Sequence, residues 1–437
     1  MNRYYRYIFS VLLVLAFATL EFSVHAQPKV LAEASPEAGG FSSARLTRLD
    51  AGMNDWVKNN WINGSAVLIA RHGKIVFYKA HGYNDPDTKA PLDKKGIFRI
   101  ASQTKAITTV AVMMLWEEGK FSLDDPVSKF IPSFAHQTVL NSYNPKDTTY
   151  TTIPAKRPVT IRDLLTHVSG IGYPAIGTPQ ENAIYAKYYT TGGGVGVKDQ
   201  KLSDAMNQLG TLPLFFQPGE QWKYGLGHDV LGYLVEVWSG MSLEDFFAKR
   251  IFQPLGMKDT YFNLPESKGS RLVNFFLQDS TGLIKKEDKV FGGGLDMNFP
   301  LQRTTFYSGG GGLSSTIYDY AIFLQMLLNG GVYNGVRLLA HNTVRMMTTN
   351  QIGNLFVDLG VKTENKWGFG FSIITDTGSR LGPSQAGTYA WGGVFSTSYW
   401  VDPKEDMIVL IYRQMWGPHV ADTDKAFRPL VYQAIND

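Results

Sequence analysis

Strand-like segments lie near both ends of the chain, and most of the predicted helices lie between them. Near the amino end, "GSAVLIARHGKIVFYKAHGYND" (64–85) consists of two β-rich runs separated by a His-Gly pair, which is typical of a hairpin. Near the carboxyl end, further strand-like runs occur at 367–376, 387–402 and 406–415. Because each strand needs a neighbour to pair with, this order predicts one sheet built from both ends of the chain.

The sequence therefore predicts an α/β (α+β) fold, in which an antiparallel sheet is flanked by helices. The sheet is expected from about residues 40–100 and 365–437, and a mostly helical insert from about 101–300. The chain has 437 residues, enough for a large core, and it shows no internal repeat and no linker that would divide it. We expect a single domain over residues 27–437.

Apolar periodicity predicts the helices of this insert and of its flanks. The helix that follows Ser102 is expected to end at Gly119, a residue suited to the position after a helix. Residues 136–158 are polar and aperiodic and predict an exposed segment, and the Tyr- and Gly-rich residues 174–210 predict a mobile loop near a cleft. Further helices are predicted at 42–60, 159–173, 228–256 (as two helices broken at Gly240), 315–331 and 426–437.

Residues 1–26 have the composition of an export signal. Two arginines precede an apolar run at 8–20, and small residues at 24–26 suit a signal peptidase. The apolar run is shorter than the roughly 20 residues of a membrane-spanning helix, although an uncleaved anchor is the alternative. We expect cleavage after Ala26, an exported protein in the periplasm or outside the cell, and no stable insertion in the membrane.

Composition excludes several classes of function. The chain has no cysteine, which excludes disulfides, thiol catalysis and Cys-ligated metal. Removing residues 1–26 takes away two arginines and one glutamate and leaves a net charge of +3, too small to indicate nucleic acid as a partner. The sequence has no G-x-S-x-G elbow, no H-E-x-x-H and no phosphate-binding P-loop, and nothing in it requires a metal or a cofactor.

Ser102 and Lys105 stand three residues apart where a predicted helix begins. Residues i and i+3 share one face of a helix, so the lysine can reach the serine hydroxyl, and the positive helix end favours an alkoxide there. The apolar residues that follow predict burial, which favours the neutral, proton-accepting form of a lysine. By itself, however, S-x-x-K also fits a solvated charge at the start of a helix.

Other segments supply further parts for acyl transfer. Tyr224 lies in a Gly-rich turn before a helix, where a phenol can face a cleft. Gly392 and Gly393 lie within a strand-like run, where glycine often marks the close approach of a ligand or backbone. A nucleophile with a proton acceptor, a phenol and exposed backbone N–H groups are the components of such chemistry. The "GGGG" at 309–312 predicts a flexible turn where two elements approach closely.

Seven segments, in order, resemble the serine β-lactamase-related superfamily, which contains β-lactamases, penicillin-binding D,D-peptidases, D-amino-acid amidases and carboxylesterases. The resemblance covers roughly residues 40–415 and implies a β-lactamase/transpeptidase-like fold. The segments are "FRIASQTK", "SLDDPVSKFIP", "IRDLLTHVSGI", "FQPGEQWKYGLGHDVLG", "IFQPLGMKDTYF", "SGGGGLSSTIYDYAIFLQMLLNGG" and "YAWGGVFSTSYWVDP".

The resemblance implies a role for each matched residue. Ser102 corresponds to the acylated nucleophile and Lys105 to its proton-accepting partner. Tyr224 matches the tyrosine of the family's Tyr-x-Asn element. The backbone N–H groups of Ser102 and Val394 would then form the oxyanion hole.

Two departures from the family pattern bear on the substrate. Leu226 stands where Tyr-x-Asn has its amide, and Trp391, followed by Gly392 and Gly393, replaces the lysine or histidine that attracts a substrate carboxylate. The Trp-Gly-Gly form resembles the esterase branch, so a small-molecule ester or amide substrate is expected, with carboxylesterase activity on small neutral esters favoured. The alternatives are a β-lactamase, a D-amino-acid peptidase or amidase on cell-wall fragments, and a non-catalytic binding protein on the same scaffold. The oligomeric state stays open.

Three polar residues in the matched segments could be assigned to the chemistry of the site, but each also has a structural interpretation. His167 is expected to be a packed residue at a helix end, because Ser169 two positions later points to another face. His228 fits either the site or a helix start. Glu220 is expected to make a structural hydrogen bond rather than act as a base for deacylation.

Overall fold

The computed structural model describes residues 29–174, 176–189, 194–292, 294–360 and 363–437. The predicted export signal lies outside the described residues. In the part of the chain that is described, no helix combines the length and the apolar character needed to cross a membrane.

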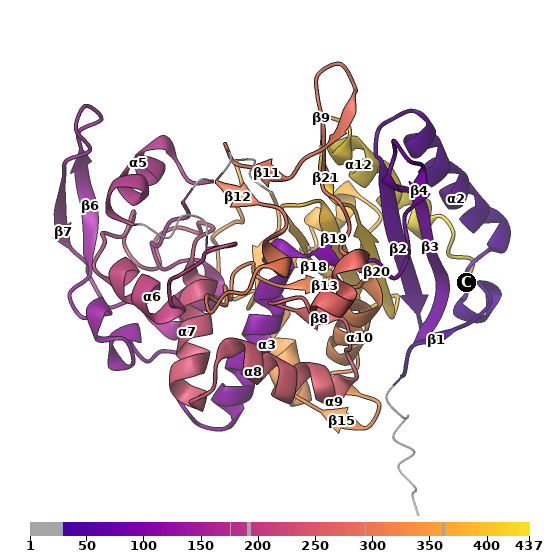
Figure 1. The fold of residues 1–437 in the computed structure, drawn as a ribbon. Coiled ribbons are helices and arrows are strands. Elements are labelled where there is room, and N and C mark those ends of the chain that lie inside the picture. The colour runs from indigo at the N-terminus through magenta and orange to yellow at the C-terminus, as the bar shows by residue number, and fades with distance from the viewer. Residues whose placement is uncertain (1–28, 175, 190–193, 293, 361–362) are drawn as a thin grey trace, which may run out of the picture.

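Both ends of the chain contribute to one sheet, as predicted (Figure 1). At its centre, β20 pairs with β2 from the amino-terminal part and with β19 from the carboxyl-terminal part, in both cases antiparallel. The short edge strand β1 pairs parallel to β3, so the sheet is mixed rather than purely antiparallel. Within the described residues the sheet has nine strands, in the order β1 (Ala32–Glu33), β3 (Lys74–Asp85), β2 (Gly64–Arg71), β20 (Met407–Tyr412), β19 (Thr397–Asp402), β18 (Tyr389–Gly393), β17 (Ser372–Ile373) and β16 (Lys366–Trp367), with β4 (Ala90–Pro91) on β3.

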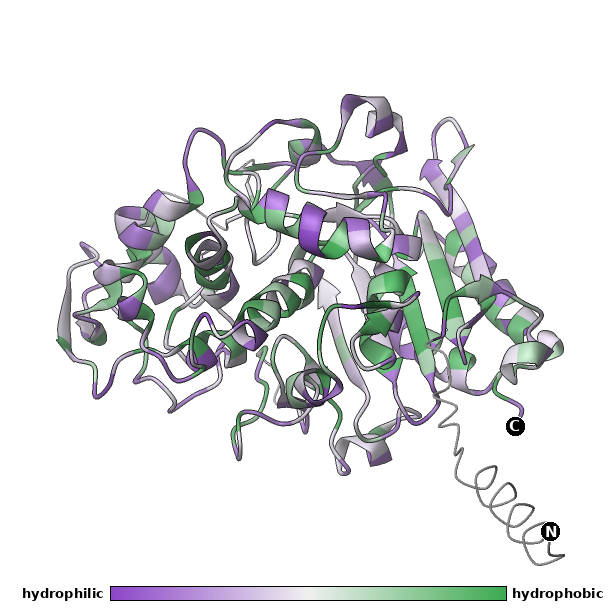
Figure 2. Cartoon of the chain, turned by 90° about the horizontal axis from the view of Figure 1, so that it is seen from below, coloured by the Kyte–Doolittle hydropathy of each residue, from purple (hydrophilic) through white to green (hydrophobic). Residues whose placement is uncertain are grey.

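Alternation along β2 explains why that strand is apolar on both sides. Ala66, Leu68 and Ala70 belong to a core shared with the central helices, whereas Val67 and Ile69 belong to a second core under two outer helices. In Figure 2 the sheet strands are largely apolar, and helices at the surface carry both polar and apolar residues. The outer helices are α2 (Ser43–Lys58) and α12 (Val420–Tyr432), and the central helices are α3 (Thr104–Glu117) and α10 (Ile317–Leu328).

The inserted region is mainly helical and packs against α3, on the side away from α2 in Figure 1. Residues 136–158 form a largely exposed hairpin, in agreement with the predicted exposed segment. Residues 174–210 contain two helices where a loop was expected. Part of that loop, residues 190–193, lies outside the described residues. The elements are β6 (Thr138–Tyr143), β7 (Tyr150–Pro154), α4 (Ile161–Thr166), α5 (Pro179–Tyr188), α6 (Leu202–Gly210), α7 (Gly227–Ser239), α8 (Leu243–Phe247), a π-helical turn Ala248–Phe252 and α9 (Gln253–Leu255).

Short strands connect this region to the sheet. Strand β13 joins β5 and β8 in a small sheet next to the start of α3, and β9 pairs with both β10 and β21. The remaining strands and α-helix are β5 (Phe98–Arg99), β8 (Thr260–Tyr261), β9 (Phe276–Gln278), β10 (Ile284–Lys286), β11 (Lys289–Val290), β12 (Leu295–Asp296), β13 (Ser314–Ser315), β14 (Val332–Tyr333), β15 (Val336–Arg337), α11 (His341–Met347) and β21 (Met415–Trp416).

The strand-like run at 387–402 is two strands rather than one. Strand β18 ends at Gly393, and β19 begins at Thr397. Ser396 adopts a left-handed φ of 69°, and its N–H donates to the carbonyl of Gly393 at 2.9 Å, which closes the turn. Gly392 and Gly393 therefore lie at the end of a strand instead of in its middle, where the chain turns beside the start of α3.

Candidate active site

Ser102 lies in a single turn of 3₁₀ helix directly before α3. The preceding residue, Ala101, adopts a φ of 44°, a left-handed conformation that costs energy for a residue with a Cβ. Gln103 anchors the turn, because its carbonyl accepts from Tyr320 Oη at 2.8 Å and its side-chain oxygen from Tyr412 Oη at 2.6 Å. The serine is thus presented by a strained turn that α10 and β20 hold in place.

Lys105 is fully buried one helical turn after the serine. Its Nζ lies 3.5 Å from Ser102 Oγ and donates to the carbonyl of Gly310 at 2.6 Å. The same Nζ lies over the ring of Tyr224, 4.5 Å from the ring centroid. The sequence-based expectation that the lysine reaches the serine agrees with this geometry, and a carbonyl and an aromatic face solvate the lysine inside the core.

Tyr224 meets the lysine with its ring rather than with its hydroxyl. Its side chain is half-buried and lies between Tyr173, stacked at 5.6 Å, and Trp391, at 5.5 Å between ring centroids. The buried hydroxyl oxygen has no hydrogen-bond partner among the described residues. A phenol with an unused donor and acceptor beside a lysine is suited to passing a proton.

Sequence reasoning missed Tyr173, which follows the glycines after α4. This tyrosine lines the same pocket as Ser102, and its ring lies 5.5 Å from Lys105 Nζ. Burial raises the pKa of Tyr173 well above its ordinary value, and Asp229 and Tyr224 raise it further. An aromatic residue placed directly after a Gly-x-Gly turn was the only signal in the sequence.

A second residue missed by sequence reasoning is Asp229, in the first turn of α7. The residue is fully buried, and its Oδ1 accepts from Ser308 Oγ at 2.6 Å and from the backbone N–H of Gly310 at 3.2 Å. Burial raises the pKa of Asp229, while the nearby Lys105 opposes this effect. Asp229 and Lys105 thus bind the two sides of the same peptide segment at Gly310.

The run of four glycines at 309–312 lies where two elements approach closely, as its sequence predicted. A Cβ on Gly309 would lie 2.4 Å from the carbonyl oxygen of His228, and one on Gly310 would lie 2.3 Å from Asp229 Oδ2. Both distances are shorter than van der Waals contact allows. Only glycine lets this turn reach α7 and place a carbonyl on the lysine.

Two buried histidines adjoin the lysine. His167, expected to be a packed residue, is buried, and its ring lies 5.0 Å from that of His228 and 4.8 Å from that of Tyr224. His228 Nε2 lies 3.2 Å from Thr109 Oγ1. Burial lowers the pKa of both histidines well below the ordinary value, and Lys105 lowers both further, so they are neutral at physiological pH.

The end of β18 lies against the turn that carries the serine. A Cβ on Gly393 would lie 2.3 Å from the carbonyl oxygen of Ile100, so glycine allows this contact. Val394 lines the same pocket as Ser102, and Trp391 and Gly392 precede it on the strand. Trp391 is half-buried, with its ring 4.6 Å from that of Trp367.

Among the residues singled out in the sequence, Ser102 and Val394 line the pocket, whereas the following are not among its lining residues: Lys105, Glu220, Tyr224, Leu226, Trp391, Gly392 and Gly393. Leu226 is fully buried in the core, and its N–H donates to the carbonyl of Gly172 at 3.1 Å just before α7. As an apolar side chain it packs inward, and the structure does not place it among the residues that line the pocket. Glu220 is exposed and pairs with Lys156 at 2.6 Å on the surface.

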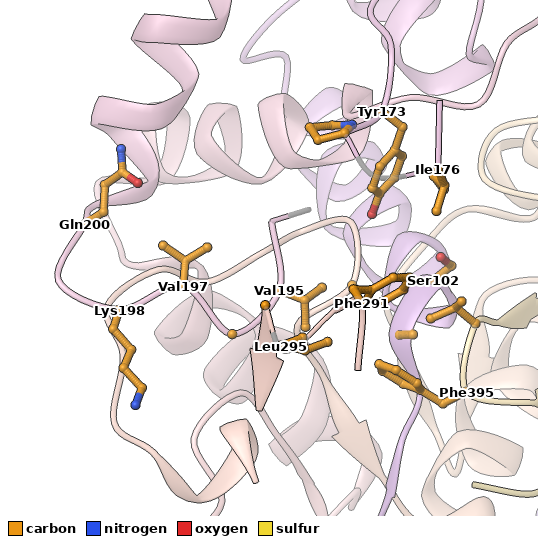
Figure 3. A pocket seen from close by; sticks show the side chains of 16 residues that line it. Ser102, Tyr173, Ile176, Val195, Val197, Lys198, Gln200, Phe291, Leu295 and Phe395 are labelled. Atoms are coloured by element: carbon orange, nitrogen blue, oxygen red, sulfur yellow. The ribbon is translucent and has the colours of Figure 1, made fainter. Parts of the chain in front are cut away.

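Ser102 opens into a pocket of about 500 Å³ (Figure 3). Six segments that are distant in the sequence line it, and most of the side chains are apolar. Figure 3 shows Phe395 near Ser102, and Lys198 and Gln200 toward the opposite end. No group of side chains in the described residues could hold a metal ion. The apolar lining includes Ala101, Pro174, Ile176, Val195, Val197, Phe291, Leu295, Val394 and Phe395.

Comparison with known proteins agrees with this geometry. A family model named Beta-lactamase matches residues 48–433. Esterase EstB of Burkholderia gladioli is 29% identical over 406 residues, which cover 89% of this chain and 96% of EstB. A putative D-alanyl-D-alanine carboxypeptidase of Escherichia coli (strain K12) is 29% identical over 422 residues, which cover 91% of this chain and 88% of that protein.

A comparison of structures gives the same fold. The structure of EstCE1, a hydrolase with promiscuous acyltransferase activity, superposes with a TM-score of 0.74 at 25% identity. The superposition covers 89% of this chain and 98% of the EstCE1 chain. The β-lactamase/transpeptidase-like fold predicted from the sequence is confirmed.

Proposed function

The chain belongs to the beta-lactamase family and is a serine hydrolase, and on that premise we propose that it is a carboxylesterase that cleaves small neutral esters. The observation that carries this proposal is the largely apolar pocket around Ser102. Trp391, which stands where the family pattern has a lysine or histidine for a substrate carboxylate, supports it. β-Lactams and peptide carboxyl ends carry that carboxylate, and its desolvation beside apolar walls is costly without a positive partner. The cation in the pocket lining, Lys198, lies toward the end opposite Ser102 (Figure 3). A neutral ester avoids this cost.

The proposed reaction proceeds through an acyl-enzyme. Lys105 takes the proton of Ser102 Oγ, 3.5 Å away, as the oxygen attacks the carbonyl carbon of the ester. The backbone N–H groups of Ser102 and Val394 stabilise the oxyanion. The tetrahedral intermediate then expels the alcohol, which receives a proton through Tyr224. Water attacks the acyl-serine, releases the acid and returns the proton to the serine.

The relatives support this proposal to different degrees. EstB is named an esterase and EstCE1 is described as a hydrolase with acyltransferase activity, and both reactions fit an acyl-enzyme. The Escherichia coli relative named a putative D-alanyl-D-alanine carboxypeptidase favours the alternative, a D-amino-acid peptidase acting on cell-wall fragments. Export to the periplasm or the cell exterior would bring the enzyme to such fragments and remains part of the proposal.

A substrate panel tests the proposed substrate class. A short-chain aryl ester, a chromogenic cephalosporin and a D-alanyl dipeptide are compared by kcat/KM with the wild-type protein and with Ser102→Ala. We expect the ester to be turned over most efficiently and Ser102→Ala to lose this activity. Efficient cephalosporin turnover with negligible ester cleavage would contradict the esterase proposal.

A covalent probe separates an enzyme from a binding protein on the same scaffold. We expect a fluorophosphonate to form one adduct, located on Ser102 by peptide mass spectrometry. A protein with intact near-UV circular dichroism and no adduct would favour the non-catalytic binding protein.

A further inference from the structure

The carboxylate of Asp229 is buried next to the proposed general base without touching it directly. The residue is fully buried, and its Oδ1 carries both of its hydrogen bonds, from Ser308 Oγ at 2.6 Å and from Gly310 N–H at 3.2 Å. Its Oδ2 has no hydrogen-bond partner among the described residues. Burial of a carboxylate costs desolvation free energy, so a buried carboxylate next to a catalytic group indicates a functional role.

A continuous set of contacts connects this carboxylate to the lysine. Asp229 holds the N–H side of Gly310, and the carbonyl of the same residue accepts from Lys105 Nζ at 2.6 Å. Lys105 Nζ in turn lies 3.5 Å from Ser102 Oγ. Any rotation of the peptide segment at Gly310 would therefore move the carbonyl oxygen that accepts the hydrogen bond from Lys105.

The glycine turn has little freedom to compensate for a lost contact. Gly309 packs against the α-carbon of Gly232 on α7, since a Cβ on Gly309 would lie 3.1 Å from that atom. Gly310 packs as tightly on Asp229 Oδ2. Close packing of this kind transmits a displacement instead of absorbing it.

We propose that Asp229 is a positioning residue, which orients the Gly310 carbonyl so that Lys105 is held within reach of Ser102. The inference rests on the proposed role of Lys105 as the proton acceptor. Asp229 acts through the hydrogen bonds of Oδ1, so an uncharged acceptor of the same shape should replace it in part.

The surroundings of the lysine come from several elements. His167 and His228 face it from the end of α4 and the start of α7, and both are held neutral by burial. Tyr173 and Tyr224 face it with their rings. The nearby Lys105 lowers the pKa of Asp229 against the effect of burial, so this carboxyl interacts electrostatically with the lysine.

The test compares Asp229→Ala, Asp229→Asn and Ser308→Ala by the rate at which a fluorophosphonate labels Ser102. We expect Asp229→Ala to slow labelling about 100-fold, the loss associated with a displaced catalytic group. Asp229→Asn retains an oxygen at Oδ1 and should restore at least about a tenth of the wild-type rate, and Ser308→Ala should fall between the two. The kcat for an aryl ester should fall with the labelling rate, while KM changes little.

Asp319 supplies the matched control. It is also a buried carboxylate in the first turn of a helix and accepts a backbone N–H, from Asp259 at 2.6 Å, but it lies outside the contacts of Lys105. Asp319→Asn should label at the wild-type rate, with near-UV circular dichroism confirming the fold of every variant.

Two results would overturn the proposal. One is wild-type labelling by Asp229→Ala, and the other is an Asp229→Asn variant as slow as Asp229→Ala, which would assign the effect to charge instead of orientation. A wild-type protein that takes the probe on Ser102 but cleaves no ester would refute the esterase proposal alone, because the comparison of labelling rates would remain valid.

Discussion

At the scale of single residues, Lys105 shows how a lysine side chain is accommodated inside an apolar core. Its Nζ exchanges hydration for contacts with the Gly310 carbonyl at 2.6 Å, the Tyr224 ring at 4.5 Å and the Ser102 hydroxyl at 3.5 Å. A fully buried lysine without such partners would cost several kcal/mol. The same partners orient the amine toward the serine, so burial and chemistry have a common structural basis.

Lys105→Met removes the amine while keeping most of the side-chain volume. We expect fluorophosphonate labelling and ester hydrolysis to fall by about 10²- to 10⁴-fold, the usual contribution of a general base. The exposed Lys129, replaced in the same way, should leave both rates unchanged. Labelling of Lys105→Met at the wild-type rate would show that another group accepts the serine proton.

Gly310→Ala tests the close contact between the glycine turn and Asp229. The new Cβ would lie 2.3 Å from Asp229 Oδ2, so we expect the free energy of unfolding to fall by about 1–3 kcal/mol, as for other overpacked sites. Urea unfolding measures the change. Gly382 has extended backbone and open space around its α-carbon, and Gly382→Ala should change stability by less than about 0.5 kcal/mol. Equal effects of the two substitutions would contradict the packing argument.

At the scale of elements, helix α10 begins with a buried acidic residue. Thr316 caps the helix by accepting from the N–H of Asp319 at 3.2 Å, and the Asp319 carboxylate accepts from Thr260 Oγ1 at 3.0 Å. Burial raises the pKa of Asp319 to about 6 from an ordinary value of 3.8, despite these hydrogen bonds. Helix α10 is therefore connected to β8 through a carboxyl group that is costly to ionise.

This pKa makes the contribution of Asp319 to stability dependent on pH. Between about pH 4 and pH 6 the folded protein keeps the proton that the unfolded chain has lost, so stability falls as the pH rises. Relative to Asp319→Asn, the wild-type free energy of unfolding should decrease by up to about 3 kcal/mol from pH 4 to pH 7, the amount that corresponds to the shift in pKa. Urea unfolding of both proteins across this range measures the difference. A difference independent of pH would show that the carboxyl titrates normally in the folded state.

At the scale of the whole molecule, strands from the two ends of the chain pair to form one sheet. Strand β20 has β2 on one side and β19 on the other, and the pocket is lined by six segments between Ala101 and Phe395. Because the chain contains no cysteine, no disulfide can hold these parts together. Closure of the sheet and burial of the two cores must supply the stability.

A chain that ends at Asp402 should lose cooperative folding, because it lacks the strand that joins the two parts of the sheet as well as α12. We expect the truncated chain to show no urea transition and no near-UV circular dichroism. Asp437→Asn, which only removes an exposed partner of Arg71, should stay within about 1 kcal/mol of the wild type. A cooperative transition in the truncated chain would show that the remaining residues fold independently.

Local features could be predicted from the amino-acid sequence, because their signals depend on near neighbours in the chain. Spacing on a helix placed Lys105 next to Ser102, and the His72-Gly73 pair adopts the two positive φ angles of a tight hairpin turn, 57° and 75°. Period-two and helical patterns also predicted which elements form the sheet and which the insert. The fold class followed from their order along the chain.

The distant residues that surround the serine could not be predicted from the sequence, because the packing of the folded chain brings them together. Nothing in the spacing of the sequence indicated that the Gly310 carbonyl would bind Lys105, that Asp229 would hold that segment, or that Tyr173 would line the pocket. The parallel pairing of β1 and the turn after Gly393 were also missed, since both depend on neighbours in space. Residue patterns determine helices and strands through contacts a few positions apart, whereas a site is assembled by the packing of elements that are far apart in the chain.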